Sequence, residues 1–145
     1  MPLPVPSLTV QIFGTPDSQP TRAALRFFRE RRLEVHVVDI RRKPMAAGEL
    51  RRFVEKLGAE GVADAGSAAW RDAGLAYLRM DDDELARRLL AEQRLLRLPL
   101  VRIGQGFAAG RDEARWKAIL ADAVASAAAG AGTPPGAGRA RGAGG

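Results

Sequence analysis

The first forty residues predict a strand, a helix and a second strand joined by short turns, and this unit constrains the fold more than any other part of the chain. Residues 8–13 (LTVQIF) and 34–40 (EVHVVDI) alternate apolar and polar side chains and are rich in β-branched residues, as strands are. Between them, residues 20–32 carry apolar side chains on one helical face. Such a helix usually makes a right-handed crossover between parallel strands. We therefore expect an α/β protein.

The rest of the chain adds a helical insert, a hairpin and a last helix. Apolar side chains at helical spacing predict helices over residues 46–57, 68–72, 81–96 and 112–128. Residues 99–103 and 107–109 flank a glycine-containing turn and predict a β-hairpin. The expected architecture is a mixed four-stranded sheet in the order strand, helix, strand, insert, hairpin, helix.

The same patterns predict the core and the domain limits. The apolar stripes of the two long later helices comprise Leu85, Leu89, Leu90 and Leu96 in one and Trp116, Ile119, Leu120 and Val124 in the other. Arg102 alternates with apolar neighbours in its strand and is expected to face solvent. One domain should span residues 8–128. Residues 130–145 are dominated by Gly, Ala, Pro and Arg. This composition buries too little apolar surface to offset the entropy of ordering the chain, so it predicts a flexible tail.

The chain contains no cysteine and a single histidine, His36. Disulfides, thiolate metal ligands and thiol redox chemistry are thereby excluded, and we expect neither a metal nor a cofactor. The formal net charge of +6 suits a small anion or an acidic protein partner. Nucleic acid is not favoured, because aromatic side chains do not accompany the arginine-rich segments. With no signal peptide and no apolar run near the ~20 residues of a membrane span, the cytoplasm is the expected location.

Three segments together resemble the arsenate-reductase-like branch of the thioredoxin fold, which includes glutaredoxin-like bacterial proteins. They are FGTPDSQPTRAA (residues 13–24), AAWRDAGL (68–75) and RLPLVRIGQGFAAGRDEARWKAIL (97–120). The resemblance covers about residues 8–122. It implies a thioredoxin-like fold and a site between the first helix and a cis proline, which Pro99 matches.

Ser18 stands where the family carries its nucleophilic cysteine. A serine at a helix start is expected to cap the helix, because its hydroxyl accepts a hydrogen bond from the first turn. A hydroxyl forms neither a disulfide nor a sulfenate, so the redox function of the cysteine is not expected here. The family resemblance also implies anion binding by Arg22, Arg71 and Arg111.

The residue before the cis proline departs from the family pattern. Members usually place an arginine there, where this chain has Leu98. Arg97 lies one residue earlier and, in an extended segment, is expected to point the other way.

Three functions remain open at this stage. The first is a cysteine-less pseudoenzyme without arsenate reductase or thiol–disulfide activity that keeps a weak cleft for a small oxyanion or glutathione. The second is a non-catalytic interaction or transcription-regulatory module that binds a protein such as RNA polymerase. The third is a glutathione-transferase-like enzyme that activates a thiol cosubstrate through Ser18. Whether the chain is an enzyme is thus left undecided by its sequence.

Overall fold

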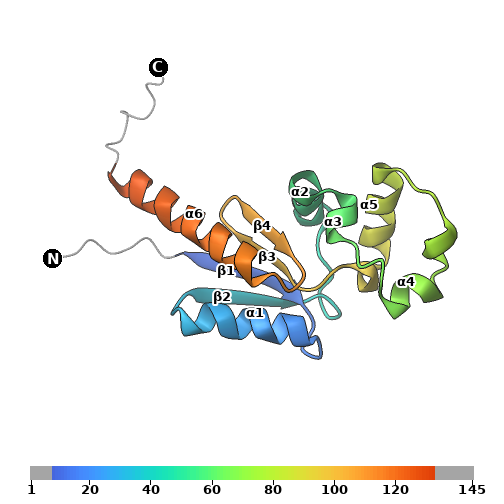
Figure 1. Ribbon diagram of the computed structural model, residues 1–145, viewed down its shortest axis with the longest axis horizontal. Coiled ribbons are helices and arrows are strands. Elements are labelled where there is room, and N and C mark those ends of the chain that lie inside the picture. The colour runs from blue at the N-terminus through green and yellow to red at the C-terminus, as the bar shows by residue number, and fades with distance from the viewer. Residues whose placement is uncertain (1–7, 133–145) are drawn as a thin grey trace, which may run out of the picture.

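The computed structural model describes residues 8–132 and contains a sheet with helices on both faces (Figure 1). In chain order the elements are β1 (Thr9–Gly14), α1 (Gln19–Glu30), β2 (Glu34–Asp39), α2 (Ala47–Leu57), α3 (Ala59–Val62), α4 (Ala68–Asp72), the 3₁₀ turn η1 (Leu75–Tyr77), α5 (Asp82–Ala91), the 3₁₀ turn η2 (Gln93–Leu95), β3 (Leu100–Ile103), β4 (Gly106–Ala109) and α6 (Glu113–Gly132). The predicted flexible tail from residue 133 onward lies outside the described residues.

The four strands lie in the order β2-β1-β3-β4. β1 and β2 are parallel, with Thr9 opposite Glu34, as a helical crossover requires. β3 is antiparallel to both β1 and β4. The predicted mixed four-stranded sheet is confirmed.

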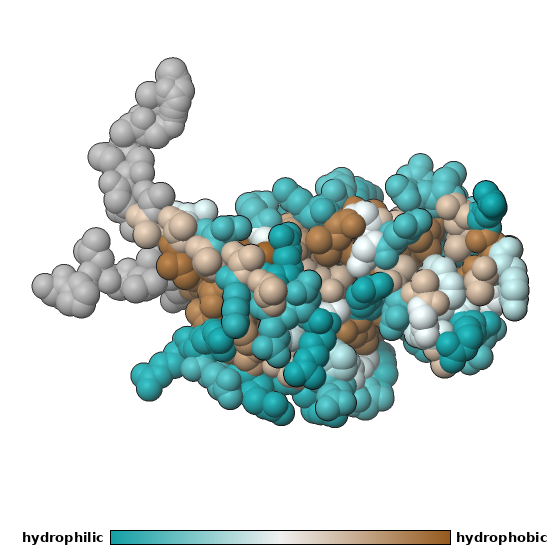
Figure 2. Space-filling view, viewed as in Figure 1, coloured by the Kyte–Doolittle hydropathy of each residue, from teal (hydrophilic) through white to brown (hydrophobic). Residues whose placement is uncertain are grey.

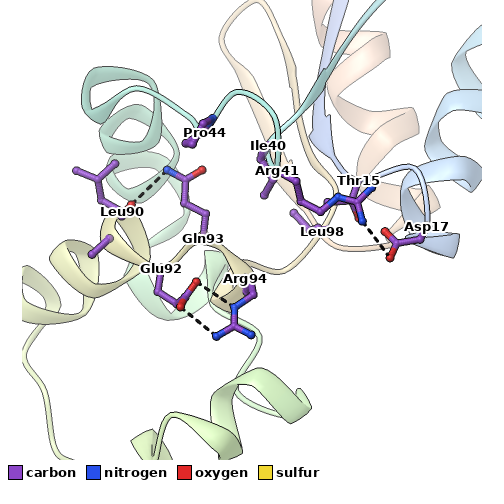
Figure 3. A pocket seen from close by; sticks show the side chains of 11 residues that line it. Thr15, Asp17, Ile40, Arg41, Pro44, Leu90, Glu92, Gln93, Arg94 and Leu98 are labelled. Atoms are coloured by element: carbon purple, nitrogen blue, oxygen red, sulfur yellow. Dashed lines mark hydrogen bonds and ion pairs between the residues drawn. The ribbon is translucent and has the colours of Figure 1, made fainter.

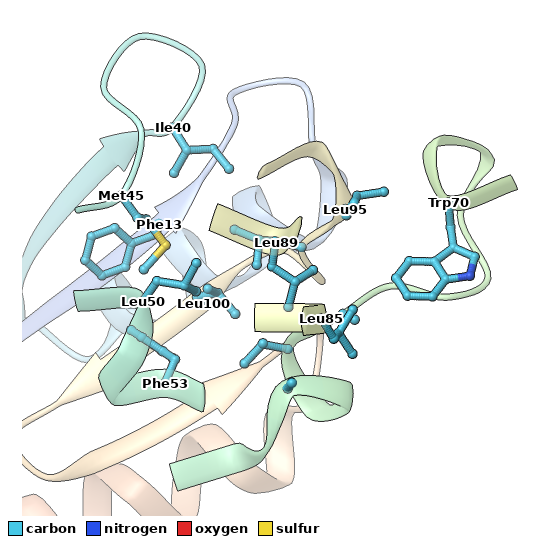
Figure 4. Close-up of a cluster of buried hydrophobic side chains, with 14 of the residues drawn as sticks. Phe13, Ile40, Met45, Leu50, Phe53, Trp70, Leu85, Leu89, Leu95 and Leu100 are labelled. Atoms are coloured by element: carbon cyan, nitrogen blue, oxygen red, sulfur yellow. The ribbon is translucent and has the colours of Figure 1, made fainter. Parts of the chain in front are cut away.

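Two apolar cores lie on the two faces of this sheet. On one face α1 and α6 bury Val10, Ile12, Phe28 and Trp116, among others. On the other face the insert packs over Phe13 and Leu100 (Figure 4), and Phe107 belongs to the same cluster. Alternation along β1 explains the split, because neighbouring side chains in a strand point to opposite faces. Edge-to-face packing of the Phe53 and Phe107 rings, at 4.9 Å between centroids, joins α2 to β4.

The insert is also held to the sheet by main-chain contacts and one buried amide. Leu96 pairs with Ala63 in an isolated antiparallel bridge, and the Asp64 N–H donates to Leu95 O at 2.8 Å. The buried Gln93 side chain accepts from the Met45 N–H at 2.8 Å and donates to Met45 O at 3.0 Å. These bonds fix η2 against the loop between β2 and α2.

Four predictions about helices and core residues were wrong. α5 ends at Ala91 rather than residue 96, because Glu92 has non-helical backbone angles (φ −133°, ψ 87°). Leu90 is 36% exposed, because α5 turns Leu85 and Leu89 toward the core and leaves Leu90 at its edge. Val124 is 47% exposed. α6 continues to Gly132 rather than ending at residue 128, and its C-terminal part runs beyond the sheet (Figure 1).

Arg102 does not face solvent as predicted. Its Nη1 lies 3.0 and 3.2 Å from the two carboxylate oxygens of Glu49, and the two side chains are only 18% and 23% exposed. Its guanidinium also lies 5.4 Å from the centre of the Phe107 ring. Alternation correctly placed Arg102 on the opposite face of β3 from its neighbours, but it could not show that α2 covers this face.

Within residues 8–132, none of the helices combines the length and apolar character that crossing a membrane requires.

Candidate functional site

Ser18 caps α1, as its residue type predicts. Its Oγ accepts a hydrogen bond from the Thr21 N–H at 3.2 Å, and its backbone is extended (φ −81°, ψ 117°). The Ser18 N–H itself donates to Thr15 O at 3.1 Å and closes the turn that follows β1. The helix thus begins at the end of the sheet where the C-terminus of β1 lies, and the Ser18 side chain is folded onto the first turn of the helix.

The capping leaves α1 with few main-chain donors for a ligand. A helix N-terminus attracts anions through N–H groups that have no partner inside the helix. Here Pro20 has no N–H, and the Thr21 N–H is already bonded to Ser18. Among the described residues, the Gln19 N–H is the first-turn donor that remains without a partner. The helix end is therefore a weaker anion site than a fully open N-terminus.

The loop before β3 lies beside this helix end. The Leu98–Pro99 peptide bond is cis, and Pro99 O accepts a hydrogen bond from the Gly110 N–H at 2.9 Å. Gly110 has a positive φ of 78°, which favours glycine. A Cβ on Gly110 would also lie 2.7 Å from Arg97 Cδ, so glycine lets the Arg97 stem lie against the turn between β4 and α6.

These segments enclose a shallow hollow that we call the arginine depression. Its volume is about 470 Å³, and its lining residues are Pro20, Asp64, Gly66, Arg97, Leu98, Ala109, Gly110, Arg111 and Asp112. Arg97 Nε donates to Ala63 O at 3.3 Å, and Arg111 Nη2 lies 3.4 Å from the Glu113 carboxylate. The Asp112 carboxylate accepts from the Arg115 N–H at 3.0 Å at the start of α6. Two guanidinium groups and two carboxylates thus share this hollow.

The arginines predicted to bind an anion are placed differently from one another. Arg111 lines the depression. Arg71 is exposed and donates to Gly66 O at 3.1 Å, which places it beside the wall of the depression. Arg22 donates to Pro16 O at 2.8 Å and lies with Arg26 on the outer face of α1, outside the depression.

Sequence reasoning placed Arg97 on the wrong side. It assumed an extended strand through residues 97–99, whereas β3 begins only at Leu100 and the chain bends at Leu98. The bend lets Arg97 line the depression together with Leu98. Pro99, directly before β3, was the signal in the sequence that the alternating pattern of the strand does not extend back to Arg97.

His36 takes no part in this site. It is exposed on β2, and its Nε2 lies 3.1 Å from a carboxylate oxygen of Glu34. The part of the chain that the structure describes contains no group of three or more His, Cys, Asp or Glu side chains that could hold a metal ion.

A second hollow, which we call the insert cleft, opens where the helical insert meets the sheet (Figure 3). It has a volume of about 530 Å³, and its lining residues are Thr15, Asp17, Ile40, Arg41, Pro44, Leu90, Ala91, Glu92, Gln93, Arg94 and Leu98. Leu98 therefore lines both the cleft and the arginine depression.

Two ion pairs border the insert cleft. Arg41 Nη1 lies 3.5 Å from an Asp17 carboxylate oxygen, and Arg94 lies 3.0 Å from Glu92. A hydrogen bond from the Thr15 side chain and the charge of Arg41 hold the pKa of Asp17 below its ordinary value. The hydrogen bond from Arg94 likewise lowers the pKa of Glu92. Both carboxylates are therefore charged at neutral pH.

Comparisons with known proteins agree with this architecture. A family model described as the ArsC family matches residues 13–119. The arsenate reductase of Neisseria meningitidis serogroup A is 30% identical over 114 residues, which cover 77% of this chain and 97% of that protein. The solved structure of an arsenate reductase from Vibrio cholerae has a TM-score of 0.69 at 19% identity and covers 79% of this chain and 99% of its own. An ArsC-family-related protein from Bacteroides fragilis has a TM-score of 0.70 at 15% identity, with 78% and 98% covered. The predicted thioredoxin-like fold is confirmed.

Proposed function

The chain belongs to the ArsC family, and from this premise we propose that it is a member without thiol-based arsenate reductase activity that binds small oxyanions weakly. The observation that carries the proposal is Ser18. It occupies the start of α1 as a helix cap, in a chain that contains no cysteine at any position. The chain therefore has no sulfur that could attack an oxyanion or form a disulfide.

The physical reason is the difference between a thiol and a hydroxyl at a helix N-terminus. The positive end of a helix stabilises a thiolate and makes it a nucleophile at neutral pH. A serine hydroxyl stays protonated there and offers no reversible oxidation to a disulfide. Among the described residues, no acidic or basic side chain hydrogen-bonds Ser18 Oγ. This arrangement gives no support to a glutathione-transferase-like role for Ser18.

Oxyanion binding is supported by the arginine depression. Arg97 and Arg111 present guanidinium groups, which match the geometry of oxyanions, and Arg71 is anchored beside them. Asp64 and Asp112 offset part of this positive charge. Because the α1 terminus also lacks most of its donors, we expect millimolar rather than micromolar affinity.

The redox part of the proposal is tested by arsenate reduction with glutathione and glutaredoxin as reductants. We expect the unaltered chain to show only the background rate. Ser18→Cys should gain measurable turnover, because a single thiol then lies at the start of a 12-residue helix. Ser67→Cys is the matched control, since Ser67 caps the short helix α4 through the same kind of hydrogen bond to the Trp70 N–H.

Each variant contains one thiol, so its pKa can be read from the pH dependence of alkylation. The thiol of Ser18→Cys should titrate about one unit below the ~8.5 of free cysteine, and that of Ser67→Cys closer to it. Reduction of arsenate by the unaltered chain at the rate of the Neisseria meningitidis relative would overturn the proposal.

The oxyanion part is tested by thermal denaturation in arsenate, phosphate and sulfate, because a ligand of the folded state raises its midpoint. Arg111→Gln should remove the increase. Arg79→Gln, which removes an exposed arginine that does not line the depression, should keep it. Equal responses of both variants would mean that the ions act through general charge screening.

A second candidate function is binding to an acidic protein. Arg22, Arg26 and Arg29 are exposed on the outer face of α1, and Figure 2 shows hydrophilic side chains over this part of the molecule. None of the three pairs with a carboxylate among residues 8–132. Like charges at this spacing destabilise a helix slightly, so an acidic partner would relieve a real cost.

This alternative, which includes an interaction with RNA polymerase, is tested by recovery of partners from a native lysate. We expect any specific partner to be lost with Arg26→Glu and retained with Arg79→Glu. Recovery of only background proteins by the unaltered chain would count against binding to an acidic protein.

Fractionation of cells would test the expected cytoplasmic location.

A further inference from the structure

β2 forms one edge of the sheet, and within the described residues no strand pairs with its outer side (Figure 1). The Ile40 N–H donates to Gly14 O, so every second residue back from Ile40 directs its main-chain groups toward β1. The residues between them, Val35 and Val37, direct their N–H and C=O groups away from the sheet. No hydrogen bond from another segment of residues 8–132 reaches these groups. The edge therefore presents a row of open donors and acceptors.

The side chain of Val37 adds an apolar contact to this open edge. Val35 and Val37 lie opposite Val10 and Ile12 of β1, on the α1 face of the sheet, yet Val37 is 44% exposed. Edge strands are commonly protected by a proline, a lysine or a bulge. The centre of β2 (VHVV, residues 35–38) contains neither residue type, and its pairing with β1 is unbroken. β2 thus keeps the features that allow another strand to pair with it.

Positive charges flank β2 at both ends. Exposed cations precede and follow the strand, namely Arg31, Arg32, Arg42 and Lys43. In the part of the chain that the structure describes, none of these four forms an ion pair. The two carboxylates of β2, Glu34 and Asp39, already have basic partners of their own. An acidic ligand would therefore meet cations at both ends of the strand without having to break an existing ion pair.

We propose that the open edge of β2 binds an extended peptide segment as an added strand, with β-branched side chains at its centre and acidic side chains at both ends. The main chain of the segment would pair with the outward groups of Val35 and Val37. One of its apolar side chains would cover Val37, and its acidic ends would meet the flanking cations. The site shares no residue with the arginine depression or with the exposed arginines of α1, so the proposal goes beyond both functions proposed above.

The flanking charges disfavour a second copy of this chain as the added strand. Two copies related by a two-fold axis would pair their β2 strands antiparallel. Any register that pairs most of the strand then brings the basic segment before β2 of one copy beside the basic segment after β2 of the other. Like charges facing each other across a strand pair are destabilising. A segment with acidic ends gains attraction at the same positions.

The probe is the peptide acetyl-Glu-Asp-Thr-Val-Thr-Val-Thr-Asp-Glu-amide, titrated into isotope-labelled protein and followed by amide NMR shifts and hydrogen exchange. At about 3.3 Å per residue it spans β2 and both basic ends. In the free protein the Val35 and Val37 amides should exchange faster than those of His36 and Val38. At peptide concentrations about ten times the dissociation constant, exchange at Val35 and Val37 should slow about tenfold. His36 and Val38, already bonded to β1, should change little.

Variants of the peptide separate the main-chain contacts from the charges. N-methylation of alternate residues along one edge of the peptide should abolish binding, and N-methylation along the other edge should preserve it, because an added strand pairs through one edge only. Replacing the acidic residues of the peptide by glutamine should weaken binding about tenfold, and added salt should weaken the original peptide in the same direction.

Protein variants test the same contacts. Val37→Ser should weaken binding several-fold, and Val124→Ser is the matched control, because Val124 is a valine of similar exposure in α6. Arg42→Gln combined with Lys43→Gln should also weaken binding several-fold. Its control is Arg79→Gln combined with Arg87→Gln, which removes two exposed positive charges outside the segments that flank β2. Unchanged thermal midpoints would show that each variant folds.

The proposal is overturned if Val35 and Val37 gain no protection at millimolar peptide, if both N-methylated peptides bind equally, or if Val37→Ser and Val124→Ser have equal effects. Shifts confined to the exposed arginines of α1 would assign the acidic peptide to that face and also overturn it. Protection of the same two amides by dimerisation without peptide would show that a second copy occupies the edge. None of these results bears on oxyanion binding, which is read from thermal midpoints in arsenate, phosphate and sulfate.

Discussion

Replacement of Gln93 tests how the helical insert is held to the sheet. Gln93→Met keeps an unbranched side chain of similar length but removes the amide that bonds both main-chain groups of Met45. The amide also donates to Leu90 O at 3.3 Å. Met45 is only 4% exposed, so water cannot easily replace the lost partners.

The expected loss follows from the two main-chain groups that would be orphaned. A buried donor or acceptor without a partner costs about 1–3 kcal/mol. The Met45 N–H and C=O together would then cost about 2–6 kcal/mol, and the new apolar side chain offsets part of this because it needs no partner. We expect the free energy of unfolding to fall by about 2–4 kcal/mol.

The assay is urea denaturation followed by tryptophan fluorescence, which reports on the buried Trp70 and Trp116. Gln105→Met, in the exposed turn between β3 and β4, is the control and should change stability by less than about 0.5 kcal/mol. Gln93→Glu adds a second check, because its protonated form can donate and accept as the amide does, so its deficit should shrink at acidic pH. A Gln93→Met deficit no larger than that of the control would refute the reasoning.

Three further predictions concern other contacts. A double-mutant cycle with Arg102→Met and Glu49→Gln should give a coupling of about 1–2 kcal/mol in urea denaturation, because this pair is largely shielded from water, and a coupling near zero would contradict that. Thr21→Val should raise the free energy of unfolding by about 1 kcal/mol, because the buried Thr21 Oγ1 has no partner among the described residues; a loss of stability would show that the hydroxyl is bonded. Arg41→Gln should raise the pKa of Asp17 towards its ordinary 3.8, measured by NMR of the carboxyl carbon. Since the folded pKa is lowered, the contribution of Asp17 to stability is present above the unfolded pKa and is lost as pH falls through the folded one.

The sequence was most informative where structure depends on local contacts. Alternation in residues 8–13 and 34–40 predicted β1 and β2. In β1 it follows burial, because Val10 and Ile12 are buried in the core beneath α1 and α6, whereas Thr9 and Gln11 are only partly buried. Ser18 could be predicted as a cap from its residue type and the proline that follows closely. These features depend on spacing within a few residues.

The failures concern contacts between distant segments. Helical periodicity shows which side chains share the apolar face of a helix, but not how much of that face is buried. Leu90 was therefore assigned to the core although it lines the insert cleft and is 36% exposed. Strand alternation gives a face but not what covers it, so the partner of Arg102 could not be foreseen. Arg97 reaches the depression through a bend and a nearby glycine that no periodic pattern encodes.

Leu98 belongs to the walls of two hollows at once. If the Leu98 side chain shifts when a ligand enters one of these hollows, the shape of the other hollow changes as well. Binding of a ligand in the insert cleft and binding of an oxyanion in the arginine depression would then be thermodynamically linked, and each ligand would change the affinity for the other by the same factor. Leu98, the residue just before Pro99, would in this way couple the binding of two ligands that do not touch each other.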